Sequence, residues 1–164
     1  MADTLSSQLT NRDAEPMVIE DSRESKARLM ESVANIAFDA AEASDNTFRY
    51  FEVPSNARIS QILLSCDDLG TAGAADIGLY DTTENGSAVV DADFFASAQV
   101  LTSALANSDV THESGVYGIE DAEKPIWEAL GLSEDPHKSY DVVITVTTAT
   151  VDAGDVGLKA RFVV

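Results

Sequence analysis

The sequence contains only one cysteine, Cys66, in 164 residues. A single cysteine cannot form an intrachain disulfide, so no such cross-link stabilises the fold, which fits assembly in a reducing compartment. We expect Cys66 to be a small buried residue within a strand, because free cysteine is among the residue types most often buried.

Long apolar segments are also missing. The longest aliphatic runs cover only a few residues, whereas a membrane-spanning helix needs about 20. The N-terminal region has neither the basic segment nor the apolar segment of a signal peptide. These absences predict a soluble protein that nothing in its own sequence exports.

Basic residues are scarce: ten Lys and Arg face 29 Asp and Glu, which gives a net charge of −19. Nucleic-acid binding depends on Lys and Arg that displace counterions from phosphates. An anionic membrane likewise attracts basic segments and repels acidic ones. We therefore predict that neither nucleic acid nor a membrane is a partner. The hydrophobic content of 45% is normal for a globular domain.

Motifs for catalysis and for cofactor binding are missing as well. The sequence has no Gly-x-Ser-x-Gly, no Gly-x-x-x-x-Gly-Lys and no Gly-x-Gly-x-x-Gly, which removes the usual hydrolase and phosphate-binding signatures. His112 and His137 lack further metal ligands at fixed spacing, so we expect both at the surface. The acids near Asp67, Asp76 and Asp91 do not match a calcium loop. We expect no cofactor, no metal and no enzymatic activity, with a bound divalent cation and a two-acid hydrolase as the alternatives.

What is present is a series of segments with strand periodicity. Residues 47–53 carry aromatic rings on both sides, which predicts a strand that lies between two layers. Pro54 has no N–H for a ladder and should end that strand. Asn85-Gly86 predicts a tight turn. The predicted strands are 47–53, 59–66, 76–80, 88–95, 116–117, 140–148 and 156–164.

Three other segments need separate interpretation. Residues 28–43 fit a helical face and a strand alternation equally well, and we favour a strand for the first ten because neighbouring segments are β. Residues 96–106 fit a strand or a short helix. Residues 120–130 predict a helix capped by Asp121 and followed by Gly131. Within it we expect Trp127 to fill the core rather than to stack on a sugar.

The whole pattern predicts an all-β protein: a β-sandwich or jelly roll of about eight strands with one short helix. Residues 1–27 are polar apart from the apolar patch Met17-Val18-Ile19, and they show no sustained hydrophobic periodicity. We expect an extended N-terminal arm that orders on a partner, followed by a domain over 28–164. A frayed terminus is the equal alternative. Residues 1–28 carry a net charge of −2, which leaves −17 on the rest.

Three phrases of the sequence resemble the head decoration proteins, or cement proteins, of tailed bacteriophages. The phrases are FRYFEVPSNARISQILLSCDDLG, AADIGLYDTTENGSAVVDADFFASA and EKPIWEALGLSEDP, and the resemblance extends from about Arg28 to Val164. It implies a β-sandwich or jelly-roll subunit on the outside of an icosahedral head, assembled in the bacterial cytoplasm. It further implies that copies clamp neighbouring major capsid proteins, without cofactor or catalysis.

This resemblance makes a structural virion protein the leading hypothesis. Contacts with the major capsid protein are expected first at Met17, Val18 and Ile19. Asn85 and the pair Phe94-Phe95 are weaker candidates, and the pair fits the core equally well. A homo-oligomer, either a dimer or a trimer, suits a lattice of two-fold and three-fold contacts. The alternative is a carbohydrate-binding or adhesion module, which would need exposed aromatic side chains.

Overall fold

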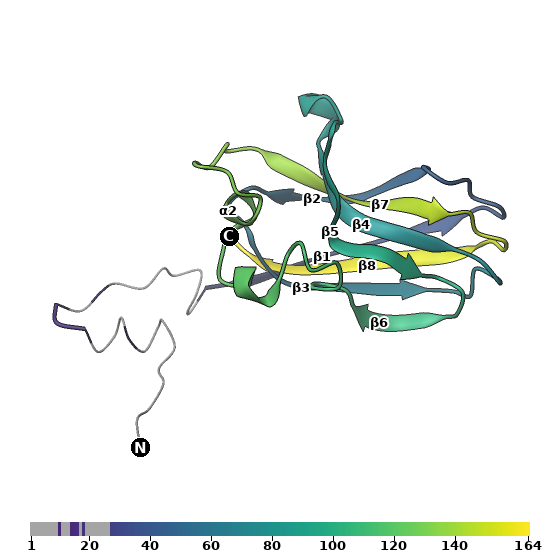
Figure 1. Ribbon diagram of the computed structural model, residues 1–164, viewed down its shortest axis with the longest axis horizontal. Coiled ribbons are helices and arrows are strands. Elements are labelled where there is room, and N and C mark those ends of the chain that lie inside the picture. Colours follow the sequence, from purple (N-terminus) through teal and green to yellow (C-terminus); the bar gives the residue numbers. More distant parts are fainter. Residues whose placement is uncertain (1–9, 11–13, 17, 19–26) are drawn as a thin grey trace, which may run out of the picture.

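The structure, a computed structural model, describes residues 10, 14–16, 18 and 27–164 (Figure 1). Eight strands form two four-stranded antiparallel sheets, which confirms the predicted all-β sandwich. The strands are β1 (Leu29–Phe38), β2 (Thr47–Pro54), β3 (Arg58–Cys66), β4 (Ala74–Asp81), β5 (Val89–Val100), β6 (Leu105–Asp109), β7 (Ser139–Thr148) and β8 (Gly154–Val163). Most of the predicted arm lies outside the described residues, so that part of the domain division stays a prediction.

The order of the strands identifies the sandwich as a jelly roll. One sheet has the order β1-β8-β3-β6 and the other has the order β2-β7-β4-β5. The pairs β1–β8, β2–β7, β3–β6 and β4–β5 make the two halves of the chain run side by side as one long hairpin. Additional pairing of β8 with β3 and of β7 with β4 rolls this hairpin into two sheets. Only the β4–β5 connection stays within one sheet.

The core lies between the two sheets and contains a compact aromatic cluster. The Phe94 and Phe95 rings pack edge to face with centroids 5.0 Å apart, and the Tyr117 ring lies 5.3 Å from Phe94. The Tyr117 hydroxyl donates a hydrogen bond of 3.1 Å to the Ile59 carbonyl. Phe94 and Phe95 are both 0% exposed. They belong to the core, which is the alternative predicted for this pair, and neither ring is exposed for contact with a partner.

The helix predicted over residues 120–130 is much shorter than expected. A 3-10 turn covers Ile119–Asp121, and helix α2 covers only Ile126–Ala129. Pro125 precedes α2 and disfavours helical geometry at the residue before it, so no helix can run through this point. The Asp121 carboxylate accepts the Gly118 N–H and so closes the 3-10 turn.

The side chains of α2 also differ from the prediction. Ile126 is fully buried, whereas Trp127 is half-buried and does not join the core. Gly131 has a φ of 74°, as expected for the residue after a helix. Trp127 is therefore not the core plug that its position suggested.

Two further corrections concern β2 and the loop before α2. The β2–β7 register shifts between Arg49 and Phe51, so Phe48, Tyr50 and Phe51 all pack against the core instead of alternating across the strand. β2 lies at the edge of its sheet. The 116–117 strand does not form; Tyr117 donates its N–H to Phe94 from a loop. Residues 29–38 are a strand, as favoured, and 96–106 divides between β5 and β6.

Gly78 permits the close approach of β5 to β4. A Cβ at this position would overlap the Asp91 carbonyl oxygen and the backbone of Ala92. Neither group can move without disrupting the strand. A Cβ on Gly157 would meet only ordinary contacts, the nearest at 3.5 Å.

We expect Gly78→Ala to lower the melting temperature by about 2–12 °C, since overpacking costs about 1–3 kcal/mol. The matched substitution Gly157→Ala should leave it unchanged or slightly raised. Thermal unfolding followed by circular dichroism compares the two variants. Equal melting temperatures of the two variants would show that stability does not depend on the close approach of β5 to β4 at Gly78.

Candidate functional site

The hairpin between β4 and β5 projects from one side of the sandwich (Figure 1). Its end is a 3-10 turn, Thr83–Asn85, followed by Gly86 with a φ of 97°, which confirms the predicted tight turn. Residues 83–89 are all exposed, including Asn85. The structure therefore presents Asn85 at a prominent surface position, while its role as a contact stays a prediction.

Two cations hold the base of this hairpin. The Arg49 guanidinium donates to the Asp81 carbonyl at 2.9 Å, to the Ser87 carbonyl at 3.2 Å and to the Asp141 carboxylate at 2.6 Å. Lys138 forms an ion pair with the Asp81 carboxylate. Since Asp81 and Ser87 lie on opposite limbs of the hairpin, Arg49 links both limbs to β7.

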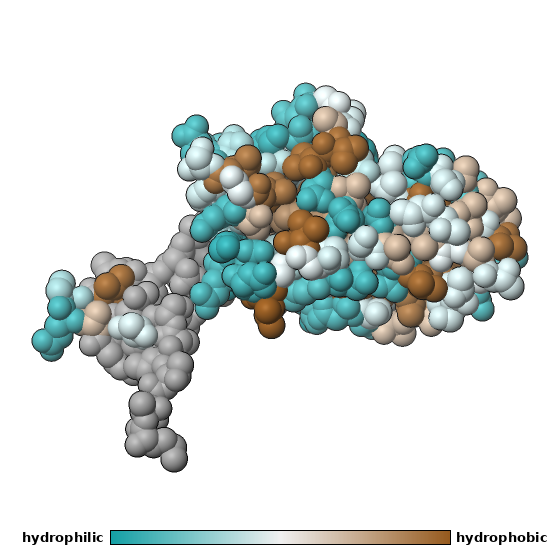
Figure 2. All heavy atoms as spheres, in the orientation of Figure 1, coloured by the Kyte–Doolittle hydropathy of each residue, from teal (hydrophilic) through white to brown (hydrophobic). Residues whose placement is uncertain are grey.

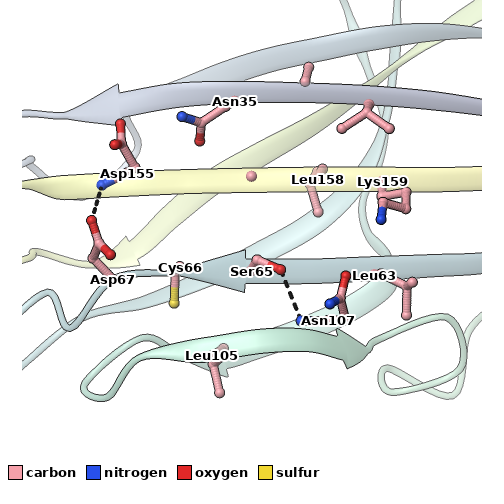
Figure 3. Close-up of a pocket in the computed structure, with 13 residues that line it drawn as sticks. Asn35, Leu63, Ser65, Cys66, Asp67, Leu105, Asn107, Asp155, Leu158 and Lys159 are labelled. Atoms are coloured by element: carbon pink, nitrogen blue, oxygen red, sulfur yellow. Dashed lines mark hydrogen bonds between the residues drawn. The ribbon is translucent and has the colours of Figure 1, made fainter.

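A second feature is a shallow groove of about 370 Å³ on the outer face of the β1-β8-β3-β6 sheet (Figure 3). Gly157 lies in its floor and leaves room because it has no side chain. Side chains from all four strands surround this position. They include Val33 and Asn35 from β1, Lys159 from β8, Leu63 and Ser65 from β3, and Leu105 and Asn107 from β6.

Two of the polar side chains that line the groove, those of Ser65 and Asp67, accept hydrogen bonds from backbone N–H groups. Figure 3 shows the Asn107 N–H donating to the Ser65 hydroxyl and the Asp155 N–H donating to the Asp67 carboxylate, both at 2.9 Å. Burial raises the pKa of the Cys66 thiol, which lowers the fraction of reactive thiolate at neutral pH. The Cys66 thiol at the groove is therefore not an activated nucleophile.

No group of three or more His, Cys, Asp or Glu that could hold a metal ion occurs among the described residues. In the same part of the chain, no helix is both long and apolar enough to cross a membrane. His112 and His137 are exposed, as predicted. Cys66 is free and buried, also as predicted.

The aromatic side chains offer no exposed platform. All eleven lie within residues 27–164, and each of them is buried or half-buried. The face shown in Figure 2 is largely hydrophilic, with separate apolar patches rather than one continuous apolar surface. Stacking of a sugar ring on an exposed aromatic residue therefore has no support.

Of the three residues predicted in the arm, the structure describes only Val18, which is 49% exposed. Met17 and Ile19 lie outside the described residues. Sequence reasoning missed the exposed apolar residues of β1: Leu29 at 54%, Met30 at 46% and Val33 at 64%. The sequence did contain a signal for this exposed apolar strand: residues 29–38 include only one charged residue, Glu31.

Neither a protein-family model nor a curated protein matches the sequence. A chain in the capsid of Ralstonia phage GP4 superimposes with a TM-score of 0.60, covers 83% of this chain and 84% of that one, and is 16% identical. This chain shares its fold with a phage capsid chain. A chain in the capsid asymmetric unit of cyanophage Pam1 covers 84% of this chain and 86% of that one, with 18% identity and a TM-score of 0.49.

We expect Arg49→Gln to loosen the projecting hairpin because it removes the charge that bonds to both limbs and to Asp141. Hydrogen bonds to charged groups contribute more than neutral ones, and partial exposure of Arg49 reduces the effect. Hydrogen exchange should accelerate in residues 82–88 while β8 keeps its protection. Unchanged exchange in the hairpin would contradict the role given to Arg49.

The acids on β5 predict a dependence of stability on pH. Burial, followed by the neighbouring Asp93, raises the pKa of Asp91. A carboxyl with a raised folded pKa favours the folded state when protonated, and this advantage is lost as the pH rises through that pKa. Asp91→Asn should therefore raise the melting temperature at pH 7 and have little effect at pH values below the range where carboxyls ionise. A thermal scan against pH that shows equal effects throughout would refute this.

Proposed function

We propose that this chain is a structural virion protein that binds the outside of an icosahedral phage head and stabilises it by bridging subunits of the major capsid protein. The observation that carries the proposal is the jelly roll shared over most of its length with a chain in the capsid of Ralstonia phage GP4. The sequence phrases that resemble decoration proteins support the same role independently of that superposition.

The charge of the protein fits an outer position on the head. The body carries a net charge of −17, and the hairpin of residues 82–88 contains an acid and no base. Such a surface repels the phosphates of a packaged genome. An outer shell protein must bind other proteins without competing for nucleic acid, and this charge meets that requirement.

Bridging requires several contacts on each copy. We propose two of them: the apolar patch Met17-Val18-Ile19 of the N-terminal arm, and the projecting hairpin around Asn85. Val18 and Asn85 are exposed. Weak contacts made at two places on one copy add to a much stronger attachment, because the second contact forms at a high effective concentration. The body is then held at one point while the arm lies across a neighbouring subunit.

The alternative of a carbohydrate-binding module is disfavoured by the aromatic residues. A sugar-stacking site needs an exposed ring, and every aromatic side chain of this protein is at least half-buried. Trp127, the only tryptophan in the sequence, lies in α2 and is half-buried. No specific observation favours a second function.

The test is co-sedimentation of the purified protein with phage heads that have been stripped of it. We expect saturable pelleting, and we expect replacement of Met17, Val18 and Ile19 by Ser to weaken it about tenfold or more, since each lost apolar anchor at an interface costs about 1 kcal/mol or more. The melting temperature of the free variant should stay unchanged because the arm precedes the folded domain. A version that lacks residues 1–27 gives the upper limit of the arm's contribution.

The outcomes separate the function from the site. Saturable pelleting that is indifferent to the arm would keep the function and move the contacts to the body, where Asn85→Ala tests the hairpin. An absence of pelleting at any concentration would reject the capsid role. Binding in a glycan array would then favour the carbohydrate-binding alternative.

A further inference from the structure

Each sheet of the sandwich ends in two edge strands: β1 and β6 in one sheet, β2 and β5 in the other. The outer side of an edge strand exposes backbone N–H and C=O groups that can pair with a strand of another chain. Proteins usually prevent this with bulges, charges, prolines or very short edge strands. The four edges of this protein differ in this respect.

Three of the edges carry such protection. β2 has a register shift between Arg49 and Phe51 and ends at Pro54. β5 has three register shifts against β4 and carries two acids, Asp91 and Asp93. β6 has only five residues and also a register shift against β3.

The fourth edge, β1, has none of these features. It pairs with β8 over all ten residues without a register shift, from Leu29 opposite Val163 to Phe38 opposite Gly154. It contains no proline and no glycine. Its only charged residue is Glu31, whose carboxylate accepts a hydrogen bond of 2.8 Å from Arg161 on β8. The Glu31 carboxylate is thus directed toward β8, where it does not oppose pairing at the other side of β1.

The charge distribution also favours approach to this edge by a second copy. β1 and β8 together contain two acids, Glu31 and Asp155, and two bases, Lys159 and Arg161. This pair of strands is therefore neutral, in a body of −17. Two acidic copies that meet at β1 bring neutral strands together and keep the acidic surfaces apart, which lowers the repulsion between them.

We propose that β1 pairs antiparallel with β1 of a second copy of this chain, so that two four-stranded sheets become one eight-stranded sheet across a two-fold axis. In such an interface both copies contribute the same strand, so the assembly is complete with two copies and cannot extend further. In a pairing centred near the middle of the strand, Val33 approaches its equivalent while Glu31 stays away from its own. The inference concerns the free protein and does not depend on the proposed function.

The size of the contact sets the expected strength. A stable interface buries about 800 Å² on each partner, and one strand paired along its edge provides less than this. We therefore expect a weak, reversible dimer in solution. Attachment to any ordered surface that presents two sites about the same axis would strengthen it by raising the effective concentration.

The experiment is sedimentation equilibrium of the full-length protein from low-micromolar to near-millimolar concentration. We expect a reversible monomer–dimer equilibrium that Val33→Lys weakens about tenfold or more, because like charges directly opposite across a strand pair are unfavourable. The matched control is Val89→Lys on the protected edge β5, where the exposure of 60% is close to the 64% of Val33. This control should dissociate like the unmodified protein. Val33→Glu, which also places like charges opposite each other across the strand pair, replaces Val33→Lys if that variant does not fold.

Four results would overturn the proposal. They are a monomer throughout the range, a trimer, a dimer insensitive to Val33→Lys, and equal weakening by Val89→Lys. A dimer lost when Met17, Val18 and Ile19 become Ser, but kept in Val33→Lys, would assign the contact to the arm instead. Hydrogen exchange provides a second measurement: protection of residues 29–38 should rise with protein concentration, while residues 105–109 should not change.

Discussion

The structure depends on two strands, β7 and β8, that occupy interior positions in the two sheets. β7 pairs with β2 and β4, and β8 pairs with β1 and β3. Every second residue of both strands is buried in the core. These residues are Tyr140, Val142, Ile144 and Val146 on β7, and Val156, Leu158, Ala160 and Phe162 on β8. The two strands thus supply both the ladder and the apolar surface that joins the sheets.

This central pair leaves the periphery available for other tasks. The β4–β5 hairpin extends beyond the sandwich because its base is fixed by Arg49 and Lys138, not by further packing. The outer face of the β1-β8-β3-β6 sheet has a groove at Gly157, which has no side chain to fill it. These exposed parts fit the proposed role, in which the periphery of the sandwich contacts other proteins.

The sequence predicted the elements with strong local signals and failed where tertiary contacts decide. Alternating apolar residues predicted β3, β7 and β8 closely, and Asn85-Gly86 predicted the tight turn. The helix over 120–130 failed because the break at Pro125 outweighs the helical spacing on both sides of it. Val116 and Tyr117 predicted a short strand because both residue types favour strands, but Tyr117 packs against Phe94 from a loop.

The candidate surfaces were less predictable still. Phe94 and Phe95 are adjacent, and adjacent residues of a regular strand face opposite sides, so the sequence left both an interface and the core open for this pair. The register shifts in β5 bury both. The position of β1 at an edge of its sheet could not be predicted, for a different reason. Only the sheet order reveals which strand lies at an edge, and no local pattern encodes that order.

The interior position of β7 and β8 also governs when this protein can fold. Each sheet lacks one of its two interior strands until residues 139–163 have been synthesised, since β8 joins β1 to β3 and β7 joins β2 to β4. Most of the stabilising contacts therefore join residues far apart in the sequence, which makes folding slow relative to helical proteins of this size. During synthesis, the β4–β5 and β3–β6 pairs can form before β7 and β8 exist, but neither sheet is complete until then. The −17 charge of the body disfavours association of such incomplete chains with one another.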